Sequence, residues 1–332
     1  MMSLSKKMIF IVFLSLFACN SVKIEEKTAD DNIENEVATD HFVVAYLAVD
    51  DYKTNTIRWH AITHLNLAFL YPNKDGSLSD EKLHNKISEI VTEAHLNTVK
   101  VIVSIKDREA GQFAEAITNN PSNLADNLIK YVEANKLDGF DIDFEDWSSE
   151  NVAQDLLSFV KELSRKKSMN MIQSCAVNAY DNGYTTEWHR YFDIINIMAY
   201  DWHGPWHTEG QHSPFDKSSA AVEFLNKEME SPLSKLTLGI PFYGYSWNDG
   251  DPPGYAYRYY QILAMSPDRD IANNDRVDNI YYNGKKTIIE KAKWVKKNKV
   301  GGIMIWQIGQ DAKNDDDSLL DAIGKIILKN DS

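Results

Sequence analysis

Three carboxylic acids recur at every second position in the segment Leu137 to Trp147. Successive side chains of an extended strand point to opposite faces, so acids with this spacing share one face. These acids are Asp141, Asp143 and Glu145. The opposite face carries only large apolar side chains, at Phe140, Ile142 and Phe144. The segment is therefore expected to be a strand that buries one face against helices and presents acids on the other.

Acids this close together repel one another, and they cannot all ionise cheaply where water is scarce. At least one of them should keep its proton near neutral pH, beside another that is ionised. A protonated carboxylic acid next to a carboxylate is what general acid catalysis at a glycosidic oxygen requires. The row of acids therefore predicts a catalytic strand.

Other interpretations explain the pattern less well. A solvated edge strand could carry acids on one face, but large apolar residues would not then alternate with them so strictly. A calcium-binding loop needs its glycine near the middle of the loop, whereas Gly139 comes at the start of this run, which is also rich in β-forming residues. The catalytic interpretation is therefore preferred.

The run from Asp138 to Glu145 reads D-G-F-D-I-D-F-E and resembles the D-G-x-D-x-D-x-E signature of the family 18 glycoside hydrolases, the chitinases and their relatives. The resemblance implies retaining hydrolysis of β-1,4-linked N-acetylglucosamine, with the substrate's own acetamido oxygen as the nucleophile. Glu145 would be the general acid and base, and Asp143 would stabilise the charged oxazolinium ion. Asp141 would share a proton with Asp143. No cofactor is implied.

A later stretch matches two further motifs of the same family. Met198 to Asp201 is similar to its M-x-Y-D element, and the H-G-x-W that often follows in chitinases ends here at Trp206. By this resemblance Tyr200 would donate a hydrogen bond to the acetamido carbonyl, and Asp201 would position the sugar. Met198 and Trp206 are expected to contact the substrate.

Aromatic residues at the ends of other predicted strands complete the expected substrate site. Tyr243 lies in a stretch similar to the family's G-x-P-x-Y-G element and is expected to point to the sugar. Trp306 ends the last strand, and its indole is expected to stack on the apolar face of the sugar ring at the cleavage point. Tyr46 and Phe69 end the first strands, where relatives also place aromatic residues.

The chain departs from the family pattern near the site. Where the family shows S-x-G-G after the third strand, Ser104 is kept but Lys106 and Asp107 replace both glycines. Tyr245 stands where many chitinases have arginine. Side chains are therefore expected to intrude near the floor of the site, and one hydrogen bond to the substrate is absent or supplied differently.

Short apolar runs alternate with longer amphipathic runs along the chain, as in parallel α/β proteins. Strands are expected at Phe42 to Leu47, His64 to Leu70, Val99 to Ile105, Gly139 to Glu145, Asn170 to Ala176, Ile194 to Tyr200, Leu236 to Pro241 and Gly301 to Trp306. Eight such runs in 332 residues predict one closed (β/α)8 TIM barrel, whose reactive residues sit at the carboxyl ends of the strands.

Helices are expected at Ser79 to His95, Pro121 to Ala134, Asn151 to Lys166, Lys285 to Asn298 and Ser318 to Leu328. Ser79 is the expected N-cap of the first of these. The segment between Trp247 and Tyr281 is too short for the α+β subdomain that many chitinases insert at this point. A single domain with a shallow cleft, which favours internal cleavage, is therefore expected.

Residues 1–19 are expected to be an export signal. Lys6 and Lys7 precede an apolar run that is too short to span a bilayer, and Ala18 leads directly into Cys19. The pattern resembles a bacterial lipoprotein signal in which Cys19 carries the lipid. The protein is therefore expected in the cell envelope, either periplasmic or at the cell surface, with simple secretion as the alternative.

Residues 20–40 are acidic and lack aromatic side chains, so they are expected to be a disordered tether to the catalytic barrel at residues 41–332. Residues 1–19 carry a charge of +2 and the tether −5, which leaves −11 of the total −14 on the barrel. A surface this acidic disfavours nucleic acid and anionic membrane as partners. The expected protein is a monomer that binds chitin or N-acetylglucosamine oligosaccharides and meets a membrane only through its lipid.

The cysteine and histidine residues suggest no further site. If Cys19 carries lipid, Cys175 has no disulfide partner and is expected to be a buried, inert thiol. A zinc site could be imagined at His203, His207 and His212, but no pair among them has ligand spacing with a third partner. They are therefore interpreted as loop histidines, and no metal is expected.

Rival functions remain open. An endo-β-N-acetylglucosaminidase that acts on N-glycans would share the acidic strand motif, although the run from Tyr200 to Trp206 looks more like that of chitinases. A non-catalytic chitin-binding lectin on the same fold is known among relatives that have lost the acid, whereas Glu145 is present here.

Overall fold

The computed structural model describes residues 41–54, 56–147, 151–180, 183–265 and 269–329. The expected export signal, Cys19 and the acidic tether lie outside these residues. Within the described ranges, no helix is long and apolar enough to cross a membrane.

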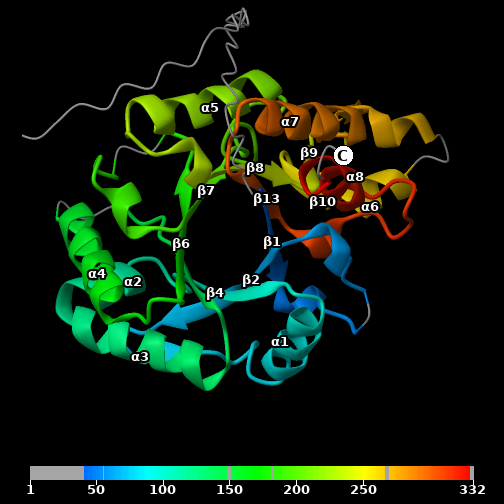
Figure 1. Cartoon of the computed structure of the whole chain (residues 1–332). Helices are drawn as coiled ribbons and strands as arrows, with labels where there is room; N and C mark the ends of the chain where they lie inside the picture. Colours follow the sequence, from blue (N-terminus) through cyan, green and yellow to red (C-terminus); the bar gives the residue numbers. More distant parts are fainter. Residues whose placement is uncertain (1–40, 55, 148–150, 181–182, 266–268, 330–332) are drawn as a thin grey trace, which may run out of the picture. The chain divides into compact units, whose positions relative to one another are not determined.

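Parallel strands form a closed ring, which Figure 1 shows end-on. In chain order they are β1 (Phe42–Ala48), β2 (His64–Pro72), β4 (Lys100–Lys106), β5 (Gly139–Asp143), β6 (Ile172–Asn178), β7 (Ile194–Met198), β8 (Leu236–Pro241) and β13 (Gly302–Trp306). The ring closes because β1 pairs in parallel with both β2 and β13. These eight strands are the predicted ones, and the predicted (β/α)8 TIM barrel is confirmed.

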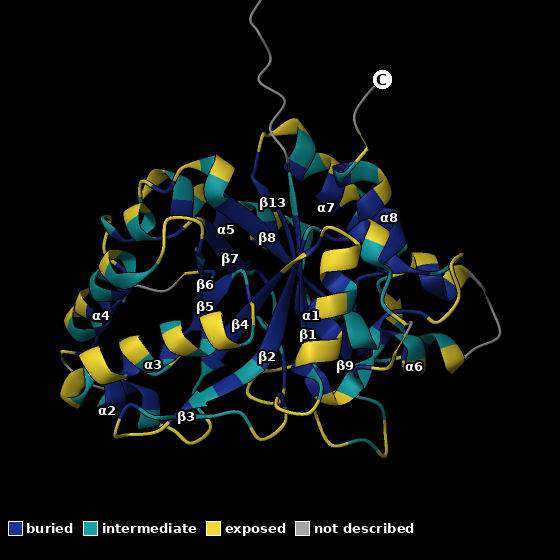
Figure 2. Cartoon of the chain, turned by 60° about the horizontal axis from the view of Figure 1, so that its bottom comes forward, coloured by how far each residue is buried: buried dark blue, intermediate teal, exposed yellow. Residues whose placement is uncertain are grey.

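The sides of each barrel strand face different surroundings. In β1, Val43 and Ala45 pack into the core between strands and helices, whereas Val44 and Tyr46 belong to a small cluster inside the barrel. Figure 2 shows the buried strands inside helices whose outer faces are exposed. The same alternation in β5 sends its apolar side chains to the outer core and its acids into the barrel interior, as the spacing predicts.

Where β13 pairs with β1 and closes the ring, the two strands approach so closely that only glycine fits. Gly302 pairs with Phe42. A Cβ atom on Gly302 would lie 2.0 Å from the carbonyl oxygen of Phe42, which is far too close for any larger residue.

Helices cover the outside of the ring. They are α1 (Ile87–Leu96), α2 (Gln112–Asn119), α3 (Pro121–Ala134), α4 (Val152–Lys166), α5 (Phe215–Lys227), α7 (Lys285–Lys297) and α8 (Leu319–Ile327). Short 3₁₀ turns occur at Val49–Asp51, Trp59–Ala61, Trp188–Tyr191, Leu233–Lys235, Arg269–Asn273 and Ile308–Gln310. The helices predicted from Pro121, Asn151, Lys285 and Ser318 are confirmed, with ends within one or two residues.

The predicted start of the first helix at Ser79 was wrong. Ser79 lies in the short strand β3 (Leu78–Ser79), where it pairs with Tyr71 near the end of β2. This pairing holds the backbone extended, and α1 begins only at Ile87. By contrast, Ser318 does cap α8, because its side-chain oxygen accepts a hydrogen bond from the backbone N–H of Asp321.

The segment after β8 carries a small antiparallel sheet of its own. Its strands are β9 (Tyr243–Ser246), β10 (Tyr255–Arg258), β11 (Arg276–Val277) and β12 (Ile280–Tyr281), in the order β10-β9-β12-β11, with helix α6 (Tyr259–Ala264) beside them. The insertion is therefore small, as its length predicts, but it is regular structure that places Tyr243 and Tyr245 beside the barrel mouth.

Candidate active site

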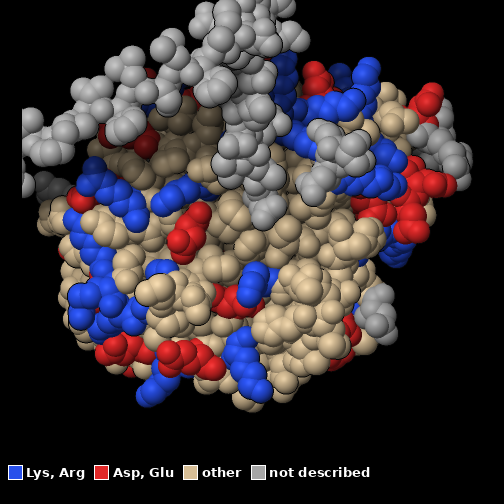
Figure 3. Space-filling model, viewed as in Figure 1, with Lys and Arg blue, Asp and Glu red and all other residues tan. Residues whose placement is uncertain are grey.

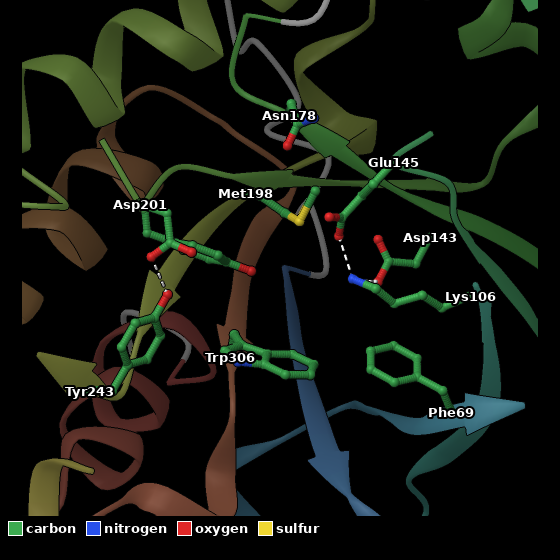
Figure 4. Close-up of a pocket in the computed structure, with 10 residues that line it drawn as sticks. Phe69, Lys106, Asp143, Glu145, Asn178, Met198, Asp201, Tyr243 and Trp306 are labelled. Carbon is green, nitrogen blue, oxygen red and sulfur yellow. Dashed lines mark hydrogen bonds and ion pairs between the residues drawn. The ribbon is translucent and has the colours of Figure 1, made fainter. Parts of the chain in front are cut away.

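The predicted acids lie together at the carboxyl end of β5. Asp141 and Asp143 are on the strand itself, and Glu145 follows just after its end. Asp143 and Glu145 border a pocket at the barrel mouth, drawn in Figure 4. The pocket is lined by Phe69, Lys106, Asp143, Glu145, Asn178, Met198, Tyr200, Asp201, Tyr243 and Trp306.

Asp141 lies beneath the pocket, fully buried, and its carboxylate is saturated with donors. Its Oδ2 accepts hydrogen bonds of 2.7 Å from both Tyr46 Oη and Ser104 Oγ. Its Oδ1 accepts from Ser174 Oγ at 2.7 Å and from Asn196 Nδ2 at 3.3 Å. Burial raises the pKa of Asp141, but these donors lower it in part. These donors make Asp141 easier to ionise than burial alone would allow, but its pKa stays above the ordinary value.

Asp143, unlike Asp141, is not surrounded by hydrogen-bond donors. Burial raises its pKa well above the ordinary value, and the charges of Glu145 and Asp141 add to this effect while Lys106 opposes it. Its buried Oδ1 has no hydrogen-bond partner among the described residues. Asp143 is therefore the acid of the row whose proton burial holds most tightly, and its Oδ1 is left for an atom that enters the pocket.

Glu145 is the acid that reaches solvent, with 42% of its side chain exposed. It does not stand alone, because Lys106 Nζ donates to its Oε1 at 2.5 Å and lies 3.4 Å from Asp143 Oδ2. Burial alone would lower the pKa of Lys106, but the charges of Asp143 and Glu145 outweigh it and raise this pKa. Lys106, at a position where glycine is typical of the family, is thus a permanent cation between two acids.

Aromatic rings form the floor of the pocket. The rings of Phe69 and Trp306 stack at 5.6 Å with an angle of 18° between their planes, and Figure 4 shows them between the two walls. Both residues lie where the sequence predicts. Tyr46 does not line the pocket, because it is 2% exposed and donates to Asp141 from below.

The wall opposite Glu145 carries Tyr200, Asp201 and Tyr243. Tyr243 Oη donates to Asp201 Oδ1 at 2.5 Å. Burial raises the pKa of Tyr200 well above its ordinary value, and the charge of Asp201 adds to this, so Tyr200 remains a phenol that can donate. Asp201 holds a left-handed backbone conformation with φ of 67°, a strained geometry for a residue other than glycine. Trp206 is 62% exposed and does not line this pocket.

Some contributors to the site were not predicted. Asn178 lines the pocket from the end of β6. Asn196 supports Asp141 from inside β7, and its polar side chain in an otherwise apolar strand is a signal that sequence analysis could have used. His212, predicted to be a loop histidine, is fully buried next to Asp201. Among the described residues, no group of three or more His, Cys, Asp or Glu side chains could hold a metal ion.

The sequence profile of the Glycosyl hydrolases family 18 matches residues 39–311. The chain belongs to glycoside hydrolase family 18. The matched range contains every barrel strand and every residue that lines the pocket.

Solved structures of family 18 proteins superpose on the chain. A chitinase from Bacteroides thetaiotaomicron is 34% identical with a TM-score of 0.83, over 87% of this chain and 96% of that one. The chitinase ChiB from the chitin utilization locus of Flavobacterium johnsoniae is 31% identical with a TM-score of 0.76, over 87% of this chain and 94% of that one.

Curated relatives are more distant. The uncharacterized glycosylase YvbX of Bacillus subtilis is 24% identical over 61% of this chain. The match spans 67% of YvbX and 58% to 64% of two other curated relatives.

The raised pKa of Asp143 predicts a pH dependence of stability. The folded state binds this proton more tightly than the unfolded chain, so the free energy of unfolding should fall as pH rises above about 4. Asp143→Asn cannot titrate, and it should lose less stability between acidic and neutral pH than the wild type. Thermal unfolding across this range, with the exposed Asp249→Asn as control, measures the difference. Parallel curves for wild type and Asp143→Asn would contradict the assignment.

Proposed function

We propose that this family 18 protein hydrolyses β-1,4-linked N-acetylglucosamine, as in chitin or chito-oligosaccharides. The observation that carries the proposal is the arrangement of Asp143, Glu145 and Tyr200 around one aromatic floor. A partly exposed acid, a buried acid with a raised pKa and a phenol donor border the same pocket. Each of these groups has a task in a reaction that uses the substrate's acetamido group as nucleophile.

In the proposed reaction Trp306 supports the apolar face of the sugar at the cleavage point. Glu145 donates a proton to the glycosidic oxygen and later takes one from the attacking water. The unpartnered Oδ1 of Asp143 accepts the N–H of the acetamido group, which turns its carbonyl oxygen toward the anomeric carbon. Tyr200 donates to that carbonyl oxygen, and Asp143, which shares its proton with Asp141, stabilises the charged oxazolinium ion.

Room for further sugar units exists beside the pocket. A second, more open hollow shares Asn178, Met198 and Tyr200 with it and adds Trp147, Ala179, Tyr180, Gly183 and Trp202. Aromatic side chains along an open groove suit a polysaccharide that continues past the cleavage point. Figure 3 shows lysine and arginine mixed with acids over the face around the mouth, so no single-sign field there favours a highly charged ligand.

Lys106 gives a reason to keep the lectin as a second candidate. Its ammonium group holds the carboxylate that must carry a proton for catalysis. A protein in which this ion pair persisted with sugar bound would bind oligosaccharide without cleaving it. An enzyme active on N-glycans is the third possibility, since it would use the same acids.

Export with a lipid on Cys19 is a proposal from the sequence alone. A lipid anchor on Cys19 would hold the barrel outside the cytoplasm, where polymers that are too large to enter a cell are accessible to the protein. Growth with labelled palmitate should label the wild-type chain, and Cys19→Ala should abolish the label and release the protein from the membrane fraction. An unlabelled wild-type chain in the culture medium would favour simple secretion instead.

Glu145→Gln should lower kcat on the N-acetylglucosamine hexamer by about a hundredfold to ten-thousandfold, because Gln keeps the shape but cannot donate the proton. Mass spectrometry of the products and calorimetric binding of the hexamer measure hydrolysis and binding separately. Binding and thermal stability should stay close to wild type.

Other outcomes of these assays would indicate the lectin or the enzyme that acts on N-glycans. A wild-type protein that binds the hexamer without cleaving it indicates the lectin. One that leaves the hexamer intact and releases the glycan from a high-mannose glycopeptide indicates the N-glycan enzyme. Equal kcat for wild type and Glu145→Gln removes Glu145 from the mechanism.

Lys106→Met should move the alkaline side of the pH–rate profile up by about one pH unit, because Lys106 is the charge that lowers the pKa of Asp143. Lys106→Arg keeps the positive charge and is the matched control, with a profile close to wild type. Initial rates on the hexamer from acidic to alkaline pH measure both. Identical profiles for Met and Arg would mean that the cation does not influence the reacting acids.

A further inference from the structure

Asp51 lies in the 3₁₀ turn Val49–Asp51 that directly follows β1, and it does not line the pocket. Its side chain is 16% exposed. Oδ2 accepts a hydrogen bond of 2.6 Å from Gln307 Nε2, and Oδ1 accepts one of 2.7 Å from Arg258 Nη1. Hydrogen bonds to a carboxylate are among the stronger ones in proteins. Asp51 therefore joins two segments that are far away from it in the sequence.

The first of these segments carries the floor of the pocket. Gln307 directly follows Trp306, and its buried side chain is used at both ends. Nε2 donates to Asp51, and Oε1 accepts from the backbone N–H of Gly309 at 2.8 Å. A Cβ atom on Gly309 would lie 2.6 Å from the Cβ of Asp51, so the two segments are also in close contact. These contacts hold the backbone where it leaves Trp306.

The second segment belongs to the wall of the pocket. Arg258 is the last residue of β10, where it pairs with Tyr243 of β9. Tyr243 is the wall residue that donates to Asp201. The side chain of Arg258 is 39% exposed, so its ion pair with Asp51 is less shielded from water than the bond between Asp51 and Gln307.

Backbone hydrogen bonds join the same two segments from the other side. The N–H of Phe242 donates to the carbonyl oxygen of Trp306 at 2.8 Å, and the N–H of Tyr259 donates to the carbonyl oxygen of Phe242 at 2.9 Å. Phe242 precedes Tyr243 in the chain, and Tyr259 follows Arg258. The contacts therefore form one closed network, whose members are Asp51, Gln307, Trp306, Phe242, Tyr259 and Arg258.

We propose that Asp51 is a positioning residue, which fixes the spacing between Trp306 in the floor and Tyr243 in the wall by closing this network. The reaction it serves is the proposed hydrolysis, so this inference rests on that function. Trp306 and Tyr243 line the same pocket, and a sugar that contacts both needs them at one spacing. Loss of the bond between Asp51 and Gln307 opens the network next to the floor.

Matched substitutions test this role. Asp51→Asn keeps the size of the side chain, but its amide has one accepting oxygen and turns an N–H group toward the second donor. Gln307→Leu removes the contact with Asp51 from the other side, so the bond can be broken in two independent ways. Asp50→Asn is the control, because Asp50 lies in the same turn but is 63% exposed and pairs with Lys82 instead.

Asp51→Asn should lower kcat/KM on the N-acetylglucosamine hexamer by about tenfold or more, because small misplacements of groups that position a substrate are costly. Gln307→Leu should lose about as much, and the double variant should lose little more than either, because all three remove one shared contact. Asp50→Asn should stay within about twofold of wild type. Thermal unfolding of each variant monitors the fold.

Two kinetic outcomes would overturn the proposal. Variants of Asp51 and Gln307 that unfold at a lower temperature but keep the wild-type kcat/KM would show that the network serves stability alone. Losses that add in the double variant would show that the two residues act separately.

The position of Trp306 can also be followed without turnover. In protein labelled with 5-fluorotryptophan, the fluorine NMR signal of Trp306 is assigned by its absence in Trp306→Phe. This signal should shift or broaden in Asp51→Asn but not in Asp50→Asn, whereas the signal of Trp294, which lies on α7, should stay unchanged.

An unchanged Trp306 signal in Asp51→Asn would overturn the proposal even if the wild type cleaves the hexamer. A hexamer that the wild type leaves intact, together with a shifted Trp306 signal in Asp51→Asn, would instead refute the proposed function and leave the positioning of Trp306 by Asp51 standing.

Discussion

The chemistry of the pocket depends on the repulsion between the acidic side chains that lie on the same face of β5. Inside a barrel, two neighbouring carboxylates cannot both be charged cheaply. Donors from β1, β4, β6 and β7 converge on Asp141 and oppose the rise of its pKa that burial causes. The cost then falls on Asp143, which keeps a proton and an unpartnered oxygen. Closure of the ring is what brings those donors together, so the fold sets the protonation of the site.

On one wall of the pocket a cation balances the outer carboxylate, because Lys106 lies against Glu145. A neutral amino-sugar polymer on an aromatic floor fits this balance better than an anionic ligand does.

The sequence predicts much of this architecture. The strands alternate apolar and polar residues or form continuous apolar runs, and the acids, Tyr200, Asp201 and Trp306 lie at strand ends where a parallel barrel collects reactive groups. The helix start predicted at Ser79 was wrong because the strand pairing of Ser79 with Tyr71 outweighs the local preference of serine for a helix N-cap. Asn196 was overlooked, although a polar side chain in an apolar strand is a signal. The burial of His212 and the contact of Lys106 with Glu145 could not be predicted, because each depends on elements that are distant in the sequence.

The central claim is that the acetamido group of the substrate is the nucleophile and that the buried acids prepare it. The most direct measurement compares hydrolysis of the N-acetylglucosamine hexamer with that of the fully de-N-acetylated glucosamine hexamer, with products followed by mass spectrometry. The account predicts shorter N-acetylated oligomers from the first substrate and no product from the second, because its acetamido oxygen is missing. Comparable cleavage of both hexamers would contradict the account.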